Sequence, residues 1–104
     1  MHGVELIMAS RQRQTELLAR LFKILGDPTR LKIIGAMVKD ELNVTQICRK
    51  LKMSQPTVSR HLGILRMSDL VVTRRNGKEI YYSLAAKACR SLKALLERGE
   101  AMVK

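Results

Sequence analysis

Two short helical patterns separated by two residues, within 43–66, constrain the fold of this chain more than any other feature. The first, "NVTQICRKL", begins with Asn43 and has Gln46 three residues later, which is the spacing of a capping box. The second, "SQPTVSRHLGILR", begins at Ser54, a residue type that favours the N-cap position. Its apolar residues recur at i, i+4 and i+7, namely Val58, Leu62 and Leu65. A short helix, a tight turn and a second amphipathic helix predict a helix-turn-helix.

The flanking segments predict two helices before this unit, and a hairpin and a helix after it. Apolar spacing from Thr15 predicts a helix ending at Gly26, and "DPTRLKIIGAMV" restarts with Asp27 as N-cap and Pro28 at the first helical position. "LVVTRRNGKEIYYSL" places Asn-Gly between two β-rich runs, which predicts a hairpin. A last apolar stripe over 85–103 predicts a final helix. The predicted fold is mainly α with a two-stranded β-hairpin wing, a winged helix-turn-helix in the order α-α-α-α-β-β-α.

Length and composition fit one small helical domain. The chain has 104 residues, of which 46% are hydrophobic and only 3% aromatic, so the core must be aliphatic. We expect residues 1–10 to be a flexible N-terminal extension and 11–104 to form a single winged-helix domain. Whether Met1 or Met8 is the natural start stays open.

The charge is strongly positive and unevenly distributed. The formal net charge is +11. Residues 1–46 carry seven basic and five acidic side chains, whereas 47–104 carry thirteen and four. The excess therefore lies in the half that contains the predicted helix-turn-helix, and it favours a polyanionic partner, here double-stranded DNA.

Several classes of function find no support in the sequence. There is no His beside a nucleophile, no glycine-rich phosphate loop and no pair of usefully spaced carboxylates, so we predict no enzyme. No His/Asp/Glu cluster has metal-ligand spacing, and neither a metal nor a cofactor is predicted. No apolar run approaches the roughly 20 residues that span a bilayer. Two cysteines without CxxC spacing fit a reducing compartment, and we expect a cytoplasmic protein.

The outward face of the helix after Ser54 carries Ser59, Arg60 and Gly63. In a helix-turn-helix the second helix enters the major groove, where hydroxyl and amide side chains bond base edges and Arg binds guanine or phosphate. Gly63 would let the backbone approach DNA closely. The alternative is a solvated face with no partner. His61 lies near the boundary of the apolar face, and a lone His is more often structural than a ligand.

The hairpin tip carries three cations, Arg74, Arg75 and Lys78, followed by one acid, Glu79. Charges at a strand edge can simply discourage aggregation. Beside a DNA-reading helix, a grip on phosphates or on the minor groove is the reading we favour.

Three other side chains have competing interpretations. Arg30, in the first turn of the second helix, is expected to make a structural ion pair or a carbonyl contact rather than to bind DNA. Cys48 and Cys89 are expected to be small buried hydrophobic residues, with a thiol sensor as the alternative.

Long stretches of the sequence resemble the ArsR/SmtB family of winged-helix repressors. The resemblance covers about residues 17–84 and is carried by "LGDPTRL", "SQPTVSRHL" and the wing residues "RRNGKEIYYSL". It implies a homodimeric repressor that is held together by the first and last helices and binds a palindromic operator. It also implies that the protein releases the operator when an inducer binds. The dimer interface would include Leu17, Leu21, Leu92 and Leu96. The DNA-binding residues would be Ser54, Gln55, Thr57, Ser59, Arg60, His61, Arg74, Arg75 and Lys78.

The family's common sensing sites do not carry over. Arsenical sensors have a run like "ELCVCDLC", where this chain has "ELNVTQIC", so Asn43 and Thr45 replace two cysteines and only Cys48 matches. The places of the zinc ligands on the last helix hold Ala86, Ala88, Gly99 and Met102. The inducer is therefore unknown.

The sequence thus predicts a sequence-specific, DNA-binding transcriptional repressor. The alternative from another class is a winged-helix module that binds an acidic protein partner through the same basic surface. Preference for one DNA sequence over another separates the two.

Overall fold

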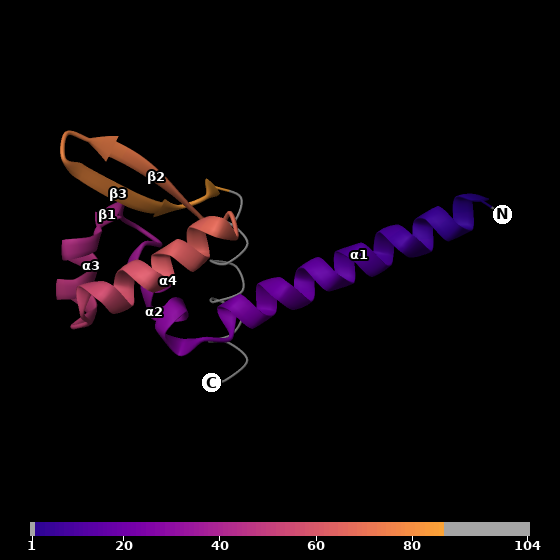
Figure 1. Ribbon diagram of the computed structural model, residues 1–104, viewed down its shortest axis with the longest axis horizontal. Coiled ribbons are helices and arrows are strands. Elements are labelled where there is room, and N and C mark those ends of the chain that lie inside the picture. Colours follow the sequence, from indigo (N-terminus) through magenta and orange to yellow (C-terminus); the bar gives the residue numbers. More distant parts are fainter. Residues whose placement is uncertain (1, 87–104) are drawn as a thin grey trace.

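The computed structural model describes residues 2–86 as a helical body with a small sheet on one side and one long projecting helix (Figure 1). The elements are α1 (His2–Leu25), α2 (Pro28–Ala36), β1 (Leu42–Asn43), α3 (Val44–Leu51), α4 (Gln55–Met67), β2 (Val71–Asn76) and β3 (Glu79–Leu84). The helix-turn-helix is α3 and α4, and the wing is the hairpin β2–β3. The predicted last helix lies outside the described residues, and so do Cys89, Leu92 and Leu96.

The core forms where α2, α3 and α4 pack together and meet the base of the hairpin. Its fully buried side chains come from all three helices: Ile33 and Ile34 of α2, Ile47 of α3, and Val58, Leu62 and Leu65 of α4. The buried hairpin residues Val71 and Leu84 pack against them. The spacing that predicted the inner face of α4 is confirmed, and the core is aliphatic as composition requires.

Side chains close the N-termini of the three short helices. The Asp27 carboxylate accepts from the backbone N–H groups of Thr29 and Arg30, at 2.8 and 3.2 Å. The N–H of Arg30 chiefly holds the pKa of Asp27 below its ordinary value of 3.8. Asn43 and Gln46 form the predicted capping box, with bonds of 2.8 and 2.9 Å. These caps fix where each helix starts, and therefore how α4 follows α3.

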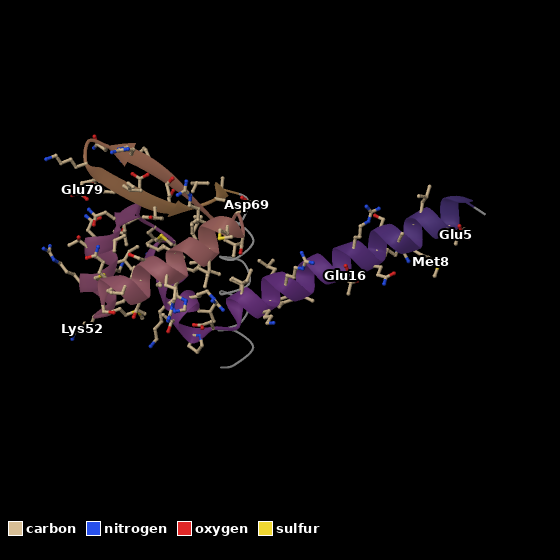
Figure 2. All side chains as sticks on the ribbon, in the orientation of Figure 1. Glu5, Met8, Glu16, Lys52, Asp69 and Glu79 are labelled. Atoms are coloured by element: carbon tan, nitrogen blue, oxygen red, sulfur yellow. The ribbon has the colours of Figure 1, made fainter. Side chains whose placement is uncertain are left out.

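The first helix differs from its prediction. It begins at His2 rather than near Thr15, so its first turns lie within 1–10, the segment expected to be a flexible extension. The predicted start is wrong because it relied on inward-facing apolar residues. The segment 2–14 has no proline, and eight of its residues are Glu, Leu, Met, Ala, Arg or Gln, which favour a helix even without such a face. Figure 2 shows Met8 on the part of α1 that projects from the body.

The sheet contains a strand that the sequence did not indicate. Its order is β1-β3-β2, with Leu42 opposite Tyr82 and Asn43 opposite Tyr81. A strand of two residues is too short for an alternating pattern to be detected. The predicted hairpin is confirmed, although its two turn residues are Gly77, with φ of 65°, and Lys78.

Candidate nucleic-acid interface

The outward face of α4 is polar and basic around Ser59 and Arg60. Ser59 and Arg60 are exposed, and no hydrogen bond or ion pair holds Arg60 to any other described residue. Gly63 is exposed as well, and a Cβ added there would meet nothing within 4 Å. The opposite side of the helix is fully buried. Core packing therefore holds α4 in place while its polar face remains exposed to a partner.

The first turn of α4 is organised by its cap. The Ser54 hydroxyl accepts from the backbone N–H of Thr57 at 3.4 Å and donates to the Thr57 hydroxyl at 2.8 Å. Gln55 is exposed, whereas Thr57 is half-buried. Ser54 and Thr57 therefore hold each other, which leaves Gln55 as the freer side chain at this end.

His61 is placed differently from the other predicted α4 residues. It is only 7% exposed, and its Nδ1 atom has no hydrogen-bond partner among the residues that the structure describes. The expectation that His61 belongs to the DNA-binding face does not fit this burial. It lies three residues after Val58 and four before Leu65, which places it on the inner stripe of the helix. That spacing was available in the sequence.

The three predicted wing cations are all exposed but not equally free. Arg74 Nε and Nη2 donate to Glu41 Oε1 at 3.0 and 2.6 Å, and its guanidinium carbon lies 5.2 Å from the centre of the Tyr81 ring. Arg75 Nε bonds the carbonyl oxygen of Gly77 at 3.3 Å, while Lys78 lies in the turn. The partnership with Glu41, 33 residues earlier, had no signal in the sequence.

Arg30 has the structural role that the sequence predicted. Its Nε donates to the carbonyl oxygen of Ile24 at 2.7 Å, and its Nη2 lies 3.8 Å from Asp27 Oδ2. This side chain therefore ties the start of α2 to the end of α1 and is not available to DNA.

No group of three or more His, Cys, Asp or Glu side chains able to hold a metal occurs among residues 2–86. Cys48 is a free, half-buried thiol that packs against the core. Its role as a thiol sensor stays a prediction.

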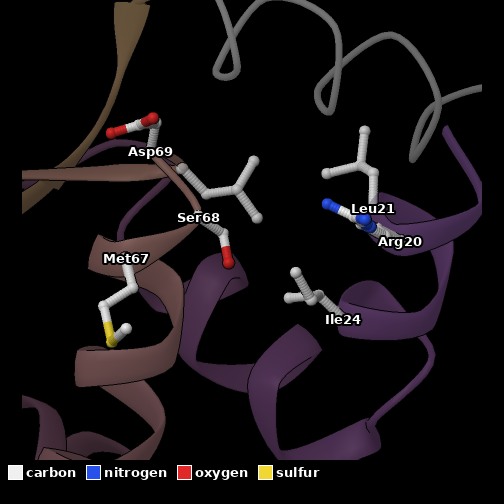
Figure 3. A pocket seen from close by; sticks show the side chains of 7 residues that line it. Arg20, Leu21, Ile24, Met67, Ser68 and Asp69 are labelled. Atoms are coloured by element: carbon white, nitrogen blue, oxygen red, sulfur yellow. The ribbon is translucent and has the colours of Figure 1, made fainter. Parts of the chain in front are cut away.

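A hollow of about 490 Å³ separates the end of α1 from the C-terminal end of α4 (Figure 3). Leu21 and Ile24 of α1 line it on one side, and Met67, Ser68 and Leu70 line it on the other. Leu21, a predicted interface residue, is therefore half-buried against its own core. The side chain of Leu17 lies outside what the structure describes. None of the described helices is long and apolar enough to cross a membrane.

Residues 27–73, from the cap of α2 into the wing, match the model of the bacterial regulatory protein, arsR family. Over 85 residues, 81% of this chain and 75% of the relative, the sequence is 39% identical to the biofilm growth-associated repressor of Xylella fastidiosa. The chain belongs to the ArsR family. The corresponding repressor of Agrobacterium fabrum is 42% identical over 88 residues, which are 84% of this chain and 74% of that one.

Solved structures of ArsR-like regulators have the same fold. The transcriptional repressor BigR from Xylella fastidiosa superimposes with a TM-score of 0.78 at 36% identity, over 93% of this chain and 97% of that one. NolR from Sinorhizobium fredii gives 0.77 at 31% identity, over 86% and 89%. The predicted winged helix-turn-helix and the predicted family are confirmed. Because the relatives are transcriptional repressors, this ArsR protein is a transcriptional regulator and not an enzyme.

Proposed function

We propose that this ArsR-family regulator represses transcription as a homodimer on a palindromic operator, in the cytoplasm, with α4 of each protomer in the major groove. The observation that carries the proposal is the exposed Arg60, which has no partner within 2–86, on a helix whose other side is fully buried. Arg on a rigid helix can donate two parallel bonds to guanine O6 and N7. Gln55 and Ser59 flank it with groups that both donate and accept.

The charge of the surrounding surface supports a DNA partner. Residues 44–84 carry eight Lys and Arg side chains against two acids, Asp69 and Glu79. Phosphate contacts supply most of the non-specific affinity of such proteins, and they weaken as salt rises. Two protomers related by a two-fold axis would place their α4 helices about 34 Å apart, one turn of the duplex.

The homodimer is proposed to form through α1 and the segment after β3. Four large apolar side chains near the start of α1 are more than half exposed: Val4, Leu6, Ile7 and Met8. A second copy of the chain would cover them. Leu17 and Leu21 of α1, together with Leu92 and Leu96, are the residues proposed for this interface.

Arg60→Ala tests the assignment of α4. Duplexes selected by the parent protein from a random pool, and scrambled versions of them, are titrated by fluorescence anisotropy. We expect the preference for the selected duplex to fall by about 5- to 150-fold, as for loss of a two-bond base contact of ~1–3 kcal/mol. Arg66→Ala is the matched control, because Arg66 is also exposed on α4 but lies in its last turn.

An unchanged preference in Arg60→Ala would remove this helix face from the interface. If the parent itself shows no preference among duplexes yet binds acidic proteins, the protein-interaction module is the better description.

A further inference from the structure

We infer that the two adjacent arginines of the wing have different tasks: Arg75 binds DNA phosphate, whereas Arg74 is a positioning residue that fixes the wing against the start of α3. This inference deepens the proposed function and rests on it for the DNA-binding half only.

The strand pleat separates the two side chains. Successive residues of a strand point to opposite faces of the sheet, while residues paired across strands share a face. Arg75 is paired with Ile80 and lies two residues on from Thr73 and four from the buried Val71, whose face packs on the helical body. Arg75 therefore extends the sheet face on which α4 lies. Arg74, paired with Tyr81, lies on the other face.

Arg74 is occupied on that outer face. Its guanidinium donates two bonds to one carboxylate oxygen of Glu41 and a third contact of 3.2 Å to the other, with the Tyr81 ring 5.2 Å away. The hydrogen bond from Arg74 holds the pKa of Glu41 below its ordinary value, and the same bond raises the pKa of Arg74. Both groups therefore stay ionised near neutral pH, and a carboxylate already neutralises the charge of Arg74.

The same face continues to the helix-turn-helix. Glu41 comes immediately before β1, and Asn43 at the end of β1 caps α3. Asn43 Nδ2 also donates to Glu79 Oε2 of the wing at 3.3 Å. The hairpin is thus attached at two points, through Arg74 and through Glu79, to the segment that starts α3. Since α3 and α4 share one core, this attachment sets the angle between the wing and α4.

Arg75 has no such partner. Its only hydrogen bond within the described chain is the 3.3 Å contact from Nε to Gly77, which leaves both terminal nitrogens unpaired there. Lys78 in the adjoining turn is exposed and makes no ion pair with any described residue. These two cations are the ones that remain available to phosphate.

The test compares Arg74→Gln, Arg75→Gln, Glu41→Gln and the double variant Glu41→Gln/Arg74→Gln by anisotropy on the selected duplex over a salt series. We expect Arg75→Gln to flatten the slope of log affinity against log salt by about 0.9 per protomer. Arg74→Gln should leave the slope unchanged and lower affinity about threefold, in the range of an exposed but well-aligned ion pair. Glu41→Gln should lower affinity to the same extent, and the double variant should be no weaker than either single one.

The sign of the Glu41→Gln effect is decisive. Removing an acid beside DNA ordinarily raises affinity, so the expected fall reports lost positioning. A rise in affinity, or a flattened slope in Arg74→Gln, would overturn the division of tasks and make Arg74 a phosphate ligand.

A second measurement needs no DNA and separates this inference from the proposed function. Amide hydrogen exchange near the β2–β3 turn should quicken in Arg74→Gln and in Glu41→Gln but not in Arg75→Gln. Equal exchange in all of these proteins would overturn the positioning role even if the operator is bound normally. A parent that prefers no duplex would instead overturn the proposed function.

Discussion

The helices α1 and α4 have similar kinds of apolar residues but opposite surroundings. In α4, Val58, Leu62 and Leu65 are fully buried by α2, α3 and the wing, whereas Leu6 of α1 is 67% exposed. Among the described side chains of α1, those that reach the core lie in its last turns: Leu25 and the half-buried Leu21 and Ile24. The body that contains α4 therefore buries the apolar side chains of that helix by itself. The start of α1 leaves its apolar side chains exposed, where a second chain could cover them.

The largest expected effect is the loss of unfolding free energy when a Leu is truncated in α4 rather than in α1. Leu62→Ala should lower the free energy of unfolding by ~2–5 kcal/mol, because it empties a packed site. The same change at exposed Leu6 should alter it by less than ~0.5 kcal/mol in the monomer. Urea unfolding at low protein concentration measures both. Comparable losses would mean that α1 is packed as tightly as α4.

The second effect concerns association. Ile7→Glu places a charge among the exposed apolar residues of α1, and burying that charge between two chains is unfavourable. We expect the dimer dissociation constant to rise at least tenfold, which is ~1.4 kcal/mol. Sedimentation velocity measures it. Gln12→Glu adds the same charge at an exposed polar position of α1 and should change little; if the two variants dissociate alike, this face of α1 is not the interface.

A smaller effect tests how the helices begin. Ser54→Ala removes the side chain that accepts from the Thr57 N–H at the start of α4, and we expect a loss of ~1 kcal/mol in unfolding free energy. Ser10→Ala in the middle of α1 changes the same atoms where the Ser side chain caps nothing. Thermal unfolding of both should show a lower midpoint for Ser54→Ala alone. Equal midpoints would indicate that the 3.4 Å bond is not formed in solution.

The smallest expected effect compares an exposed glycine of the proposed DNA-binding helix with an exposed glycine of α2. Gly63→Ala and Gly35→Ala both add a methyl group to an exposed helical position with nothing within 4 Å, so each should stabilise the fold by up to ~1 kcal/mol. Only Gly63→Ala should weaken DNA binding, because α4, unlike the α2 helix that carries Gly35, is proposed to approach the duplex. Calorimetry with DNA titration checks the pair. Unaltered affinity in Gly63→Ala would show that the α4 backbone keeps its distance from DNA.

Local signals in the sequence accounted for the helical body. Caps at Asp27, Asn43 and Ser54 and apolar spacing along 28–65 act over a few residues, and the structure confirms them. The Asn-Gly pair identified the hairpin for the same reason. The spacing placed His61 near the boundary of the apolar face, and the structure buries it there, whereas its DNA-binding role came only from the family resemblance.

Features that depend on distant residues were not predictable from spacing. Three contacts join segments more than 30 residues apart. They are the ion pair of Glu41 with Arg74, the hydrogen bond from Asn43 to Glu79 and the pairing of β1 with β3. The spacing of residues in a single sequence does not indicate which distant segments come into contact. The candidate site was therefore predicted as a set of exposed residues, while the arrangement that sorts Arg74 from Arg75 required the structure.

The pairing of β1 with β3 also has a consequence for how the chain folds. The hairpin closes across a two-residue turn, whereas Leu42 meets Tyr82 only after 40 residues have been looped. Closing a longer loop loses more chain entropy, and non-local contacts form more slowly. We expect the hairpin and α2–α4 to form first and β1 to join last, which pulse-labelled hydrogen exchange can follow. Protection of the β1–β3 amides before those of β2–β3 would reverse this order. Until β1 pairs with β3, the hairpin of a newly made chain is formed, but its angle to α4 is not yet fixed.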